Sequence, residues 1–231
     1  MPRALRIIFD LDDTLYPERS FALSGFRAAA EWARREWAMQ DKAGDMAEEM
    51  IALLDAGHLG GLFKISLKRH LPEASDEDLA QLIEIYRRHR PDIELFEDAA
   101  RALDVCAELG PLGLITDGTA YLQQNKVRAL GIAERFVKIL YTGALGEARA
   151  FYKPHPKAYE SMEAALPGAG AHFVYVGDNP KKDFITPNRR GWTTVQVRRD
   201  HGIHDAYAVA QDGVPQHIID SLDELQAVLL G

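Results

Sequence analysis

The sequence predicts an α/β protein in which a parallel sheet, covered by helices on both faces, carries an inserted block of helices. Three observations support this fold class. Short apolar segments rich in β-branched residues alternate with segments of helical periodicity from residue 112 onward. A similar apolar segment stands at residues 5–9, while residues 20–109 show almost only helical periodicity. Strands that alternate with helices are typical of a doubly wound parallel sheet.

The first half of the chain begins with a strand and continues as helices. The segment LRIIF, residues 5–9, predicts a short buried strand because its apolar, β-branched and aromatic residues are bounded by polar ones. Apolar residues at helical spacing predict helices at residues 21–33, 43–55, 62–71, 76–90 and 97–109. Ser75, followed by acidic residues, is a typical N-cap for the fourth of them.

The second half of the chain alternates regularly. Strands are predicted at residues 112–115, 137–141, 172–176, 193–197 and 217–220. Helices are predicted at residues 120–130 and 156–166, after the Gly-Asp-Asn at 177–179, and from Ser221 to the end. We therefore expect a Rossmann-like core domain made of residues 1–16 and 96–231, with residues 17–95 forming an all-helical subdomain inserted after the first strand.

Composition narrows the class of protein. The chain has 231 residues, 47% hydrophobic and 27% charged, which is ordinary for a soluble globular protein. Its net charge of −8 argues against a general nucleic-acid binder. No apolar run is long enough to span a bilayer, and the N-terminus lacks a separate hydrophobic segment with a cleavage site. The single cysteine, Cys106, lies in an apolar helical pattern and is expected in the core. We expect a cytoplasmic protein with no nucleic-acid or membrane partner.

The segment IIFDLDDTLYP, residues 7–17, places three carboxylates directly after the first predicted strand. Like charges repel, and burying even one carboxylate is unfavourable unless it is paired or binds a metal. A fold rarely needs such an arrangement, so the segment indicates a metal site or a reaction.

Other polar residues also stand at or near the carboxyl ends of predicted strands. In a doubly wound sheet the functional loops lie at these ends, so the residues are expected to converge on one cleft. They are Asp10, Asp12, Thr116, Lys153, Asp178 and Asp183. Carboxylates, a hydroxyl and an ammonium together indicate a Mg²⁺ site with room for a phosphate group.

These residues lie in four segments of the chain. The segments and their order closely resemble the four motifs of the haloacid dehalogenase (HAD) superfamily, and within it those of the metal-dependent phosphatases with a helical cap. The first motif, D-x-D-x-T, is residues 10–14, and the second is the apolar strand that ends in Thr116. The third is Lys153-Pro154, and the fourth, G-D-x-x-x-x-D, is residues 177–183. The motifs span the chain from residue 10 to residue 183, and their joint occurrence predicts one site.

The resemblance implies a role for each motif residue. Asp10 would attack phosphorus and form an aspartyl-phosphate, and Asp12 would act as general acid and then as general base. Mg²⁺ would bind Asp10, the backbone carbonyl of Asp12 and Asp178. Thr116 and Lys153 would contact the phosphoryl group, and Lys153 would also neutralise charge on the nucleophile.

Further residues would support this site. Free backbone amides around residues 12–14 and 116–118, which include Thr14, Asp117 and Gly118, would complete the phosphate cradle. Asp183 would hold the lysine of the third motif or a metal-bound water. Asn179 would orient the aspartate before it or cap the next helix. The pair Lys181-Lys182 is interpreted as a solvated face, and Lys126, in a Q-x-x-K stretch, as a structural residue near the site.

The acid at position 12 favours phosphate-ester chemistry, since the 2-haloacid dehalogenases of the superfamily carry a non-acidic residue there and need no Mg²⁺. The helical insertion matches the family's cap, and the stretch from Thr116 to Lys153 is too short for the larger cap found after the second motif. We therefore expect a Mg²⁺-dependent phosphatase, a monomer or homodimer, acting on a small phosphorylated metabolite. Among candidate substrates we place nucleoside monophosphates first, followed by sugar phosphates and organic-acid phosphates.

Three alternatives remain at this point. A sugar-phosphate mutase uses the same groups, a 2-haloacid dehalogenase has the same fold, and a non-catalytic binding protein could keep the fold without turnover. The complete set of acid, hydroxyl, lysine and metal-binding carboxylates argues against the last alternative.

Overall fold

The computed structural model describes residues 4–37, 43–58, 60–200, 202 and 209–231. The chain forms two compact units, one of Met1–Glu18 with Ile93–Gly231 and the other of Arg19–Asp92. The boundaries expected from the sequence lie within three residues of these, after residue 16 and before residue 96. Each unit has its own core and is described separately.

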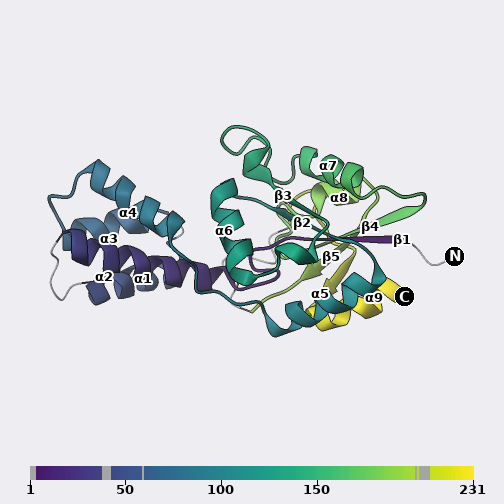
Figure 1. The fold of residues 1–231 in the computed structure, drawn as a ribbon, viewed down its shortest axis with the longest axis horizontal. Coiled ribbons are helices and arrows are strands. Elements are labelled where there is room, and N and C mark those ends of the chain that lie inside the picture. Colours follow the sequence, from purple (N-terminus) through teal and green to yellow (C-terminus); the bar gives the residue numbers. More distant parts are fainter. Residues whose placement is uncertain (1–3, 38–42, 59, 201, 203–208) are drawn as a thin grey trace. The chain divides into compact units, whose positions relative to one another are not determined.

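The first unit is built on a six-stranded sheet with the order β3-β2-β1-β4-β5-β6 (Figure 1). Every neighbouring pair runs parallel. The strands are β1 (Ala4–Phe9), β2 (Leu112–Thr116), β3 (Lys138–Tyr141), β4 (Ala171–Gly177), β5 (Thr193–Val197) and β6 (His217–Ile219). All six predicted strand segments are therefore strands, and the predicted fold class is confirmed.

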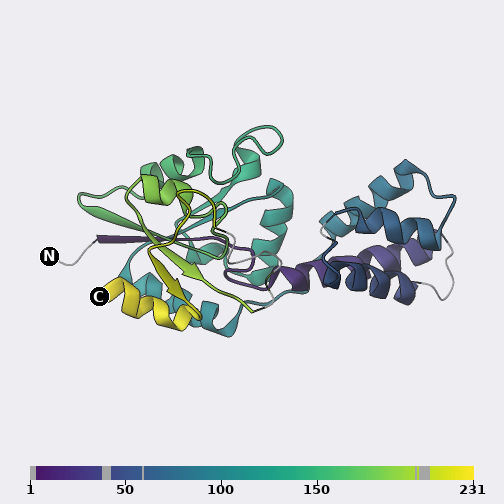
Figure 2. The ribbon, with the colours of Figure 1, turned by 180° about the vertical axis from the view of Figure 1, so that it is seen from behind.

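Helices cover both faces of this sheet. They are α5 (Glu97–Leu109), α6 (Ala120–Leu130), α7 (Lys157–Ala165), α8 (Ile185–Arg189) and α9 (Leu225–Leu230), with short 3₁₀ turns at Ala133–Arg135, Thr142–Ala144 and Leu222–Glu224. In both ribbon views α5 and α9 lie on one side of the sheet and α7 and α8 on the other (Figures 1 and 2). Cys106 of α5 is buried, as expected, and burial raises the pKa of its thiol to about 12.

The strand order brings the motif residues together. β1 is central and pairs with β2 on one side and β4 on the other. Because the three strands are parallel, their carboxyl ends lie at the same edge of the sheet. The loops that follow Phe9, Thr116 and Gly177 therefore start side by side, although more than a hundred residues separate the first from the second.

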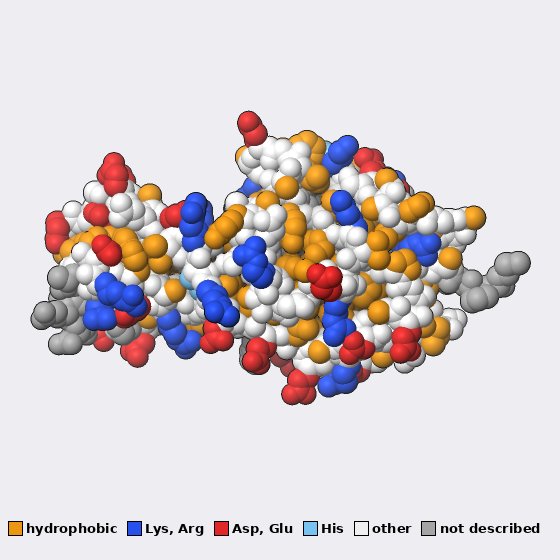
Figure 3. Space-filling model, viewed as in Figure 1, with side chains coloured by type: hydrophobic (Ala, Val, Ile, Leu, Met, Phe, Trp, Pro, Cys, Tyr) orange, Lys and Arg blue, Asp and Glu red, His pale blue; other side chains and the backbone are white. Residues whose placement is uncertain are grey.

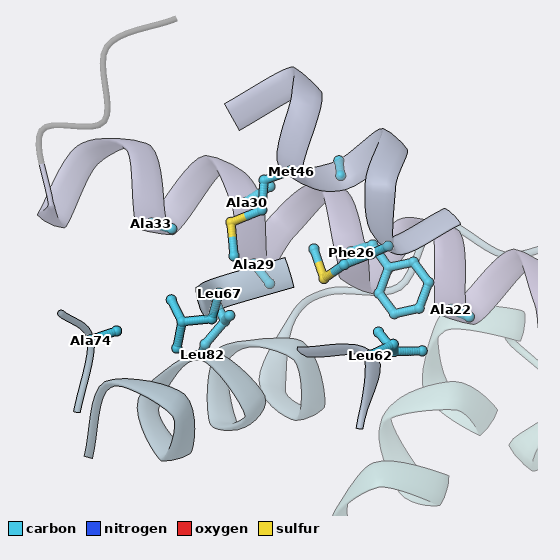
Figure 4. Close-up of a cluster of buried hydrophobic side chains, with 12 residues drawn as sticks. Ala22, Phe26, Ala29, Ala30, Ala33, Met46, Leu62, Leu67, Ala74 and Leu82 are labelled. Carbon is cyan, nitrogen blue, oxygen red and sulfur yellow. The ribbon is translucent and has the colours of Figure 1, made fainter. Parts of the chain in front are cut away.

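In its described residues, the second unit contains helices and no strand: α2 (Ala43–Asp55), α3 (Leu62–His70), α4 (Asp76–Arg88) and most of α1 (Glu18–Glu36). Its core consists of small and large apolar side chains from all four helices, among them Ala29, Met46, Leu67 and Leu82 (Figure 4). Alanines on one face of α1 allow the other helices to pack closely. Ser75 caps α4 in a reciprocal hydrogen-bond pair with Asp78, as its sequence pattern predicts.

The surface view shows acidic and basic side chains interspersed with apolar ones (Figure 3). This mixture is typical of a solvated protein surface. None of the helices in the described part of the chain is both long and apolar enough to cross a membrane.

Candidate active site

Asp10 is the first residue after β1, and its position is fixed by the sheet. Its backbone N–H donates to the carbonyl oxygen of Val176 at 2.9 Å, which continues the pairing of β1 with β4. The side chain is buried, and its Oδ1 accepts a hydrogen bond from Lys153 Nζ at 2.6 Å. Its Oδ2 is also buried but has no hydrogen-bond partner among the described residues. One carboxylate oxygen is therefore available to a ligand.

Lys153 is the central cation of the site. Its side chain is fully buried, with Nζ 2.6 Å from Asp10 Oδ1 and 2.8 Å from Asp183 Oδ1. It also donates to the Tyr175 hydroxyl at 3.1 Å. Burial alone would lower the pKa of Lys153, but the charges of Asp10 and Asp183 outweigh it and hold this pKa well above its usual value. The ammonium group therefore stays charged.

Asp10, Asp178 and Asp183 form a buried acidic cluster. One carboxylate oxygen from each lies within 4.8 Å of the others. Burial, followed by the charges of Asp183 and Asp10, raises the pKa of Asp178 well above its usual value. Burial also raises the pKa of Asp10, against the opposing effect of Lys153.

This acidic cluster fits a divalent cation. Lys153 pairs with two of the three carboxylates, Asp10 and Asp183, so it does not balance the charge of the cluster by itself. Oxygen ligands of this kind suit Mg²⁺, which binds through one or two carboxylates and fills its remaining positions with water and substrate oxygens. Asp10 Oδ2, buried and without a partner among the described residues, is an unsatisfied oxygen that a group bound at this cluster would contact.

Asp12 directs its carboxylate to other partners. Its Oδ1 accepts hydrogen bonds from the Tyr16 hydroxyl at 2.5 Å and from Lys126 Nζ at 2.6 Å. Its Oδ2 accepts one from Gln123 Nε2 at 2.8 Å. Burial alone would raise the pKa of Asp12, but Lys126 and these hydrogen bonds lower it. The Asp12 side chain is thus not part of the acidic cluster. This agrees with the resemblance, which assigns the backbone carbonyl of Asp12, and not its carboxylate, to the metal.

Thr116 is the last residue of β2, and its side chain is buried beside α6. Its Oγ1 accepts a hydrogen bond from Gln123 Nε2 at 2.5 Å. Gly118 makes this contact possible, because it has a φ of 138° and a Cβ there would lie 2.9 Å from Gln123 Cγ. The Thr14 hydroxyl is buried and has no hydrogen-bond partner in the part of the chain that is described.

Asp117 uses its carboxylate to connect two loops. Its Oδ1 accepts hydrogen bonds from the Thr142 hydroxyl at 2.8 Å and from the Lys153 backbone N–H at 3.0 Å. The side chain therefore fixes the backbone that carries Lys153. Any contact of Asp117 with a phosphate group would use its backbone amide.

The turn after β4 is closed by its own side chains. The Asn179 backbone N–H donates to Asp183 Oδ2 at 3.0 Å, and the Asn179 side chain accepts from the Lys181 N–H at 3.1 Å. Asn179 therefore stabilises this turn, whereas the next helix, α8, begins only after Phe184 and has no side-chain cap. A Cβ at Gly177 would lie 2.6 Å from Asp183 Oδ2, so only glycine lets that carboxylate approach the strand end.

Lys182 is a site residue that the sequence reasoning missed. The interpretation of Lys181-Lys182 as a solvated face is wrong for Lys182, whose side chain is 27% exposed and places Nζ 3.6 Å from Asp117 Oδ2. Burial alone would lower the pKa of Lys182, but nearby carboxylates, including Asp10, raise it. Lys182 stands directly before Asp183, inside the fourth motif, and this position could have indicated that it lies at the site. Lys181, by contrast, is exposed.

Tyr16 and Tyr175 also contact the site, through Asp12 and Lys153 respectively. No local pattern identifies either residue, because a tyrosine beside a strand is equally common in a core.

Comparison with known proteins agrees with the motifs. Residues 6–186 match the model of the haloacid dehalogenase-like hydrolase family. This range is most of the chain, so the chain belongs to that family and is a hydrolase of it. The chain is 28% identical to the glyceraldehyde 3-phosphate phosphatase of Methanopyrus kandleri, over 96% of both chains.

Solved structures show the same fold. The putative HAD-hydrolase YfnB of Bacillus subtilis, bound to magnesium, superposes with a TM-score of 0.70 at 20% identity, over 98% of this chain and 99% of that one. A 2-haloacid dehalogenase of Pseudomonas syringae superposes with a TM-score of 0.63 at 25% identity, over 97% of each chain. The family recognised from the four motifs is confirmed.

Proposed function

We propose that the protein is a Mg²⁺-dependent phosphatase that hydrolyses a small phosphorylated metabolite through an aspartyl-phosphate. One observation carries this proposal. Asp10 has a buried carboxylate oxygen without a partner among the described residues, and a fully buried lysine and two further carboxylates lie beside it. A nucleophile, a fixed cation and oxygen ligands for a metal thus meet in one place.

The first step would transfer the phosphoryl group to the enzyme. Asp10 Oδ2 attacks phosphorus, the bond from phosphorus to the ester oxygen breaks, and Asp12 gives its proton to the departing alkoxide. Lys153 holds Oδ1 of Asp10, so that Oδ2 faces the substrate. The Thr116 hydroxyl accepts from Gln123 through its oxygen, which leaves its own O–H to donate to a phosphoryl oxygen.

The second step would restore the enzyme. A water molecule attacks the phosphorus of the aspartyl-phosphate, Asp12 takes a proton from that water, and the bond from phosphorus to Asp10 breaks to release inorganic phosphate. Asp12 returns to its protonated state and Asp10 to its carboxylate. A cation held by Asp10, Asp178 and the Asp12 carbonyl would screen the nucleophile from the negative charge of the phosphate group.

The substrate is proposed to be a sugar phosphate or a related small phosphate ester. The sequence alone placed nucleoside monophosphates first. The relative from Methanopyrus kandleri, which aligns along almost the whole chain, is named for a triose phosphate, and this favours phosphorylated sugars. We further propose that the Arg19–Asp92 unit acts as the cap that selects the substrate, and that the protein acts as a monomer or homodimer.

The test is release of inorganic phosphate from p-nitrophenyl phosphate, glyceraldehyde 3-phosphate and a panel of nucleotides and sugar phosphates, with Mg²⁺ or with EDTA. We expect release that requires the metal and that Asp10→Asn abolishes. Asp104→Asn, an exposed carboxylate of α5 paired with Arg135, is the matched control and is expected to keep activity.

Other outcomes would identify the alternatives. Halide release from a 2-haloacid, without phosphate release, would indicate a dehalogenase. Interconversion of sugar phosphates without net phosphate release would indicate a mutase. Absence of activity of the wild-type protein in all three assays would favour a binding protein and overturn the proposal.

A further inference from the structure

Three side chains surround the carboxylate of Asp12, the residue proposed to transfer the proton. Tyr16 and Lys126 donate to its Oδ1 at 2.5 and 2.6 Å, and Gln123 donates to its Oδ2 at 2.8 Å. We infer that Tyr16, Gln123 and Lys126 are positioning residues that direct the transferred proton to Oδ2 of Asp12. This inference rests on the proposed phosphatase function.

The assignment of Oδ2 follows from counting lone pairs. An ionised carboxylate offers about four acceptor positions, two on each oxygen. Tyr16 and Lys126 occupy both positions on Oδ1, and Gln123 occupies one on Oδ2. The second position on Oδ2 is the one that these contacts leave for the proton that passes to the leaving group and is later taken from water.

The arrangement also fixes the plane of the carboxylate. Both oxygens accept hydrogen bonds, so rotation about the side chain would break at least one of them. A proton donor works only when it points at the departing oxygen, and small errors in orientation reduce the rate strongly. The three donors therefore supply the alignment that a single unrestrained aspartate would lack.

Helix α6 presents Gln123 and Lys126 from one face, since residues three apart lie on the same side of a helix. Both side chains are buried, with Gln123 at 1% and Lys126 at 2% exposure. Apolar residues would serve packing better at such positions, because burying an amide or an ammonium is unfavourable without polar partners. Two inward polar residues on one helix face that both reach Asp12 indicate a role in the site.

Gln123 also links the acid to the phosphate cradle. The two hydrogens of its Nε2 serve Asp12 Oδ2 at 2.8 Å and Thr116 Oγ1 at 2.5 Å. Lys126 is anchored in turn, with Nζ 3.9 Å from Glu18 Oε1 and 5.8 Å from the centre of the Tyr16 ring. The Gln123 amide therefore fixes the position of Asp12, the proposed proton donor, relative to the Thr116 hydroxyl, which is proposed to bind the phosphate group.

The consequence depends on the leaving group. An aliphatic alkoxide is a strong base and needs a proton as it departs, whereas p-nitrophenolate is a weak base and departs without one. Loss of alignment at Asp12 should therefore slow hydrolysis of an aliphatic phosphate ester much more than that of p-nitrophenyl phosphate. A loss of general packing would slow both equally.

The experiment measures kcat/KM for p-nitrophenyl phosphate and for glyceraldehyde 3-phosphate, or the best aliphatic ester of the substrate screen. This constant covers the steps up to aspartyl-phosphate formation and so includes departure of the leaving group. The variants are Gln123→Met, which keeps the volume without the amide, Lys126→Met and Tyr16→Phe. Gln124→Ala is the control, because Gln124 is the exposed neighbour on the same helix.

We expect the ratio of aliphatic to aryl kcat/KM to fall about tenfold or more in the Gln123 and Lys126 variants, since general acid catalysis contributes roughly 10²–10⁴-fold. Tyr16→Phe should lower it in the same direction, and Gln124→Ala should leave it unchanged. Thermal unfolding identifies any variant that does not fold. If Lys126→Met is such a variant, Gln123→Met and Tyr16→Phe carry the test.

An unchanged ratio in Gln123→Met and Tyr16→Phe would overturn the inference, whether both rates fall together or neither falls. Failure of the proposed function is a separate result, because it would be seen in the wild-type enzyme as absence of phosphate release from both esters.

Discussion

Replacing Lys153 by Met tests how the acidic cluster is held together. Lys153 is fully buried and contacts Asp10 at 2.6 Å and Asp183 at 2.8 Å. Methionine has a similar length but no charge, so the substitution leaves two buried carboxylates without their cation. Removing one partner of a buried ion pair costs about 3–5 kcal/mol, mostly because the remaining charge is left unpaired.

This cost can be measured as a shift in unfolding temperature. For a protein of this size one kcal/mol corresponds to about 2–4 °C, so we expect Lys153→Met to unfold roughly 6–20 °C below the wild type in EDTA. Circular dichroism would follow the transition. Lys157→Met is the matched control, because Lys157 is exposed four residues further along and its loss should change stability by less than about 0.5 kcal/mol.

Addition of Mg²⁺ provides a second test of whether Lys153 balances the charge of the acidic cluster. A bound cation replaces part of the lost positive charge, so Mg²⁺ should raise the unfolding temperature of Lys153→Met more than that of the wild type. If Lys153→Met unfolds at the wild-type temperature in EDTA, the lysine does not balance the cluster and the reasoning is refuted.

Two further predictions concern the same site. Stabilisation by a fixed Mg²⁺ concentration should be larger near pH 8 than near pH 6. Burial raises the pKa of Asp10 and Asp178, so the folded site binds protons more tightly than the unfolded chain, and protons compete with the metal as the pH falls. An equal shift in unfolding temperature at both pH values would contradict this. Lys182 lies beside Asp117 at the candidate site, and we expect its ammonium to donate a hydrogen bond to the phosphate group of the substrate. A hydrogen bond to a charged group contributes roughly 1.5–3 kcal/mol, so Lys182→Met should raise KM for phosphate esters about tenfold or more. Lys181 is exposed, and Lys181→Met should leave KM unchanged. Equal KM values in steady-state assays of the two variants would show that Lys182 has no part in binding.

Local patterns in the sequence were sufficient for most of the elements. Predicted and observed bounds coincide for α2, α5, α6 and β5, because periodicity and flanking residues decide these segments locally. Helix α4 was predicted to reach residue 90 but ends at Arg88. His89 leaves the helix with a ψ of 156°, and its ring contacts the Tyr86 carbonyl and the Ser24 hydroxyl. Ser24 is 65 residues away, so this end is set by packing.

The candidate site was predictable as a set of residues. Polar side chains that interrupt apolar segments at strand ends stand out in one dimension, and the order of the four motifs identifies the family. The assigned roles of Asp10, Asp12, Thr116, Lys153 and Asp178 remain predictions until the substitutions above are measured.

The sequence by itself determined the strands, the helices, the hydrolase family and the residues that follow each strand, since all of these depend on neighbours along the chain. Only the tertiary structure decided the partners. Lys153 reaches Asp10 across 143 positions, and Lys126 reaches Asp12 across 114. Lys181 and Lys182 are adjacent and chemically identical, yet one is exposed and the other lies beside Asp117. The physical reason is that charge pairing and burial depend on distance in space, which a sequence pattern does not contain.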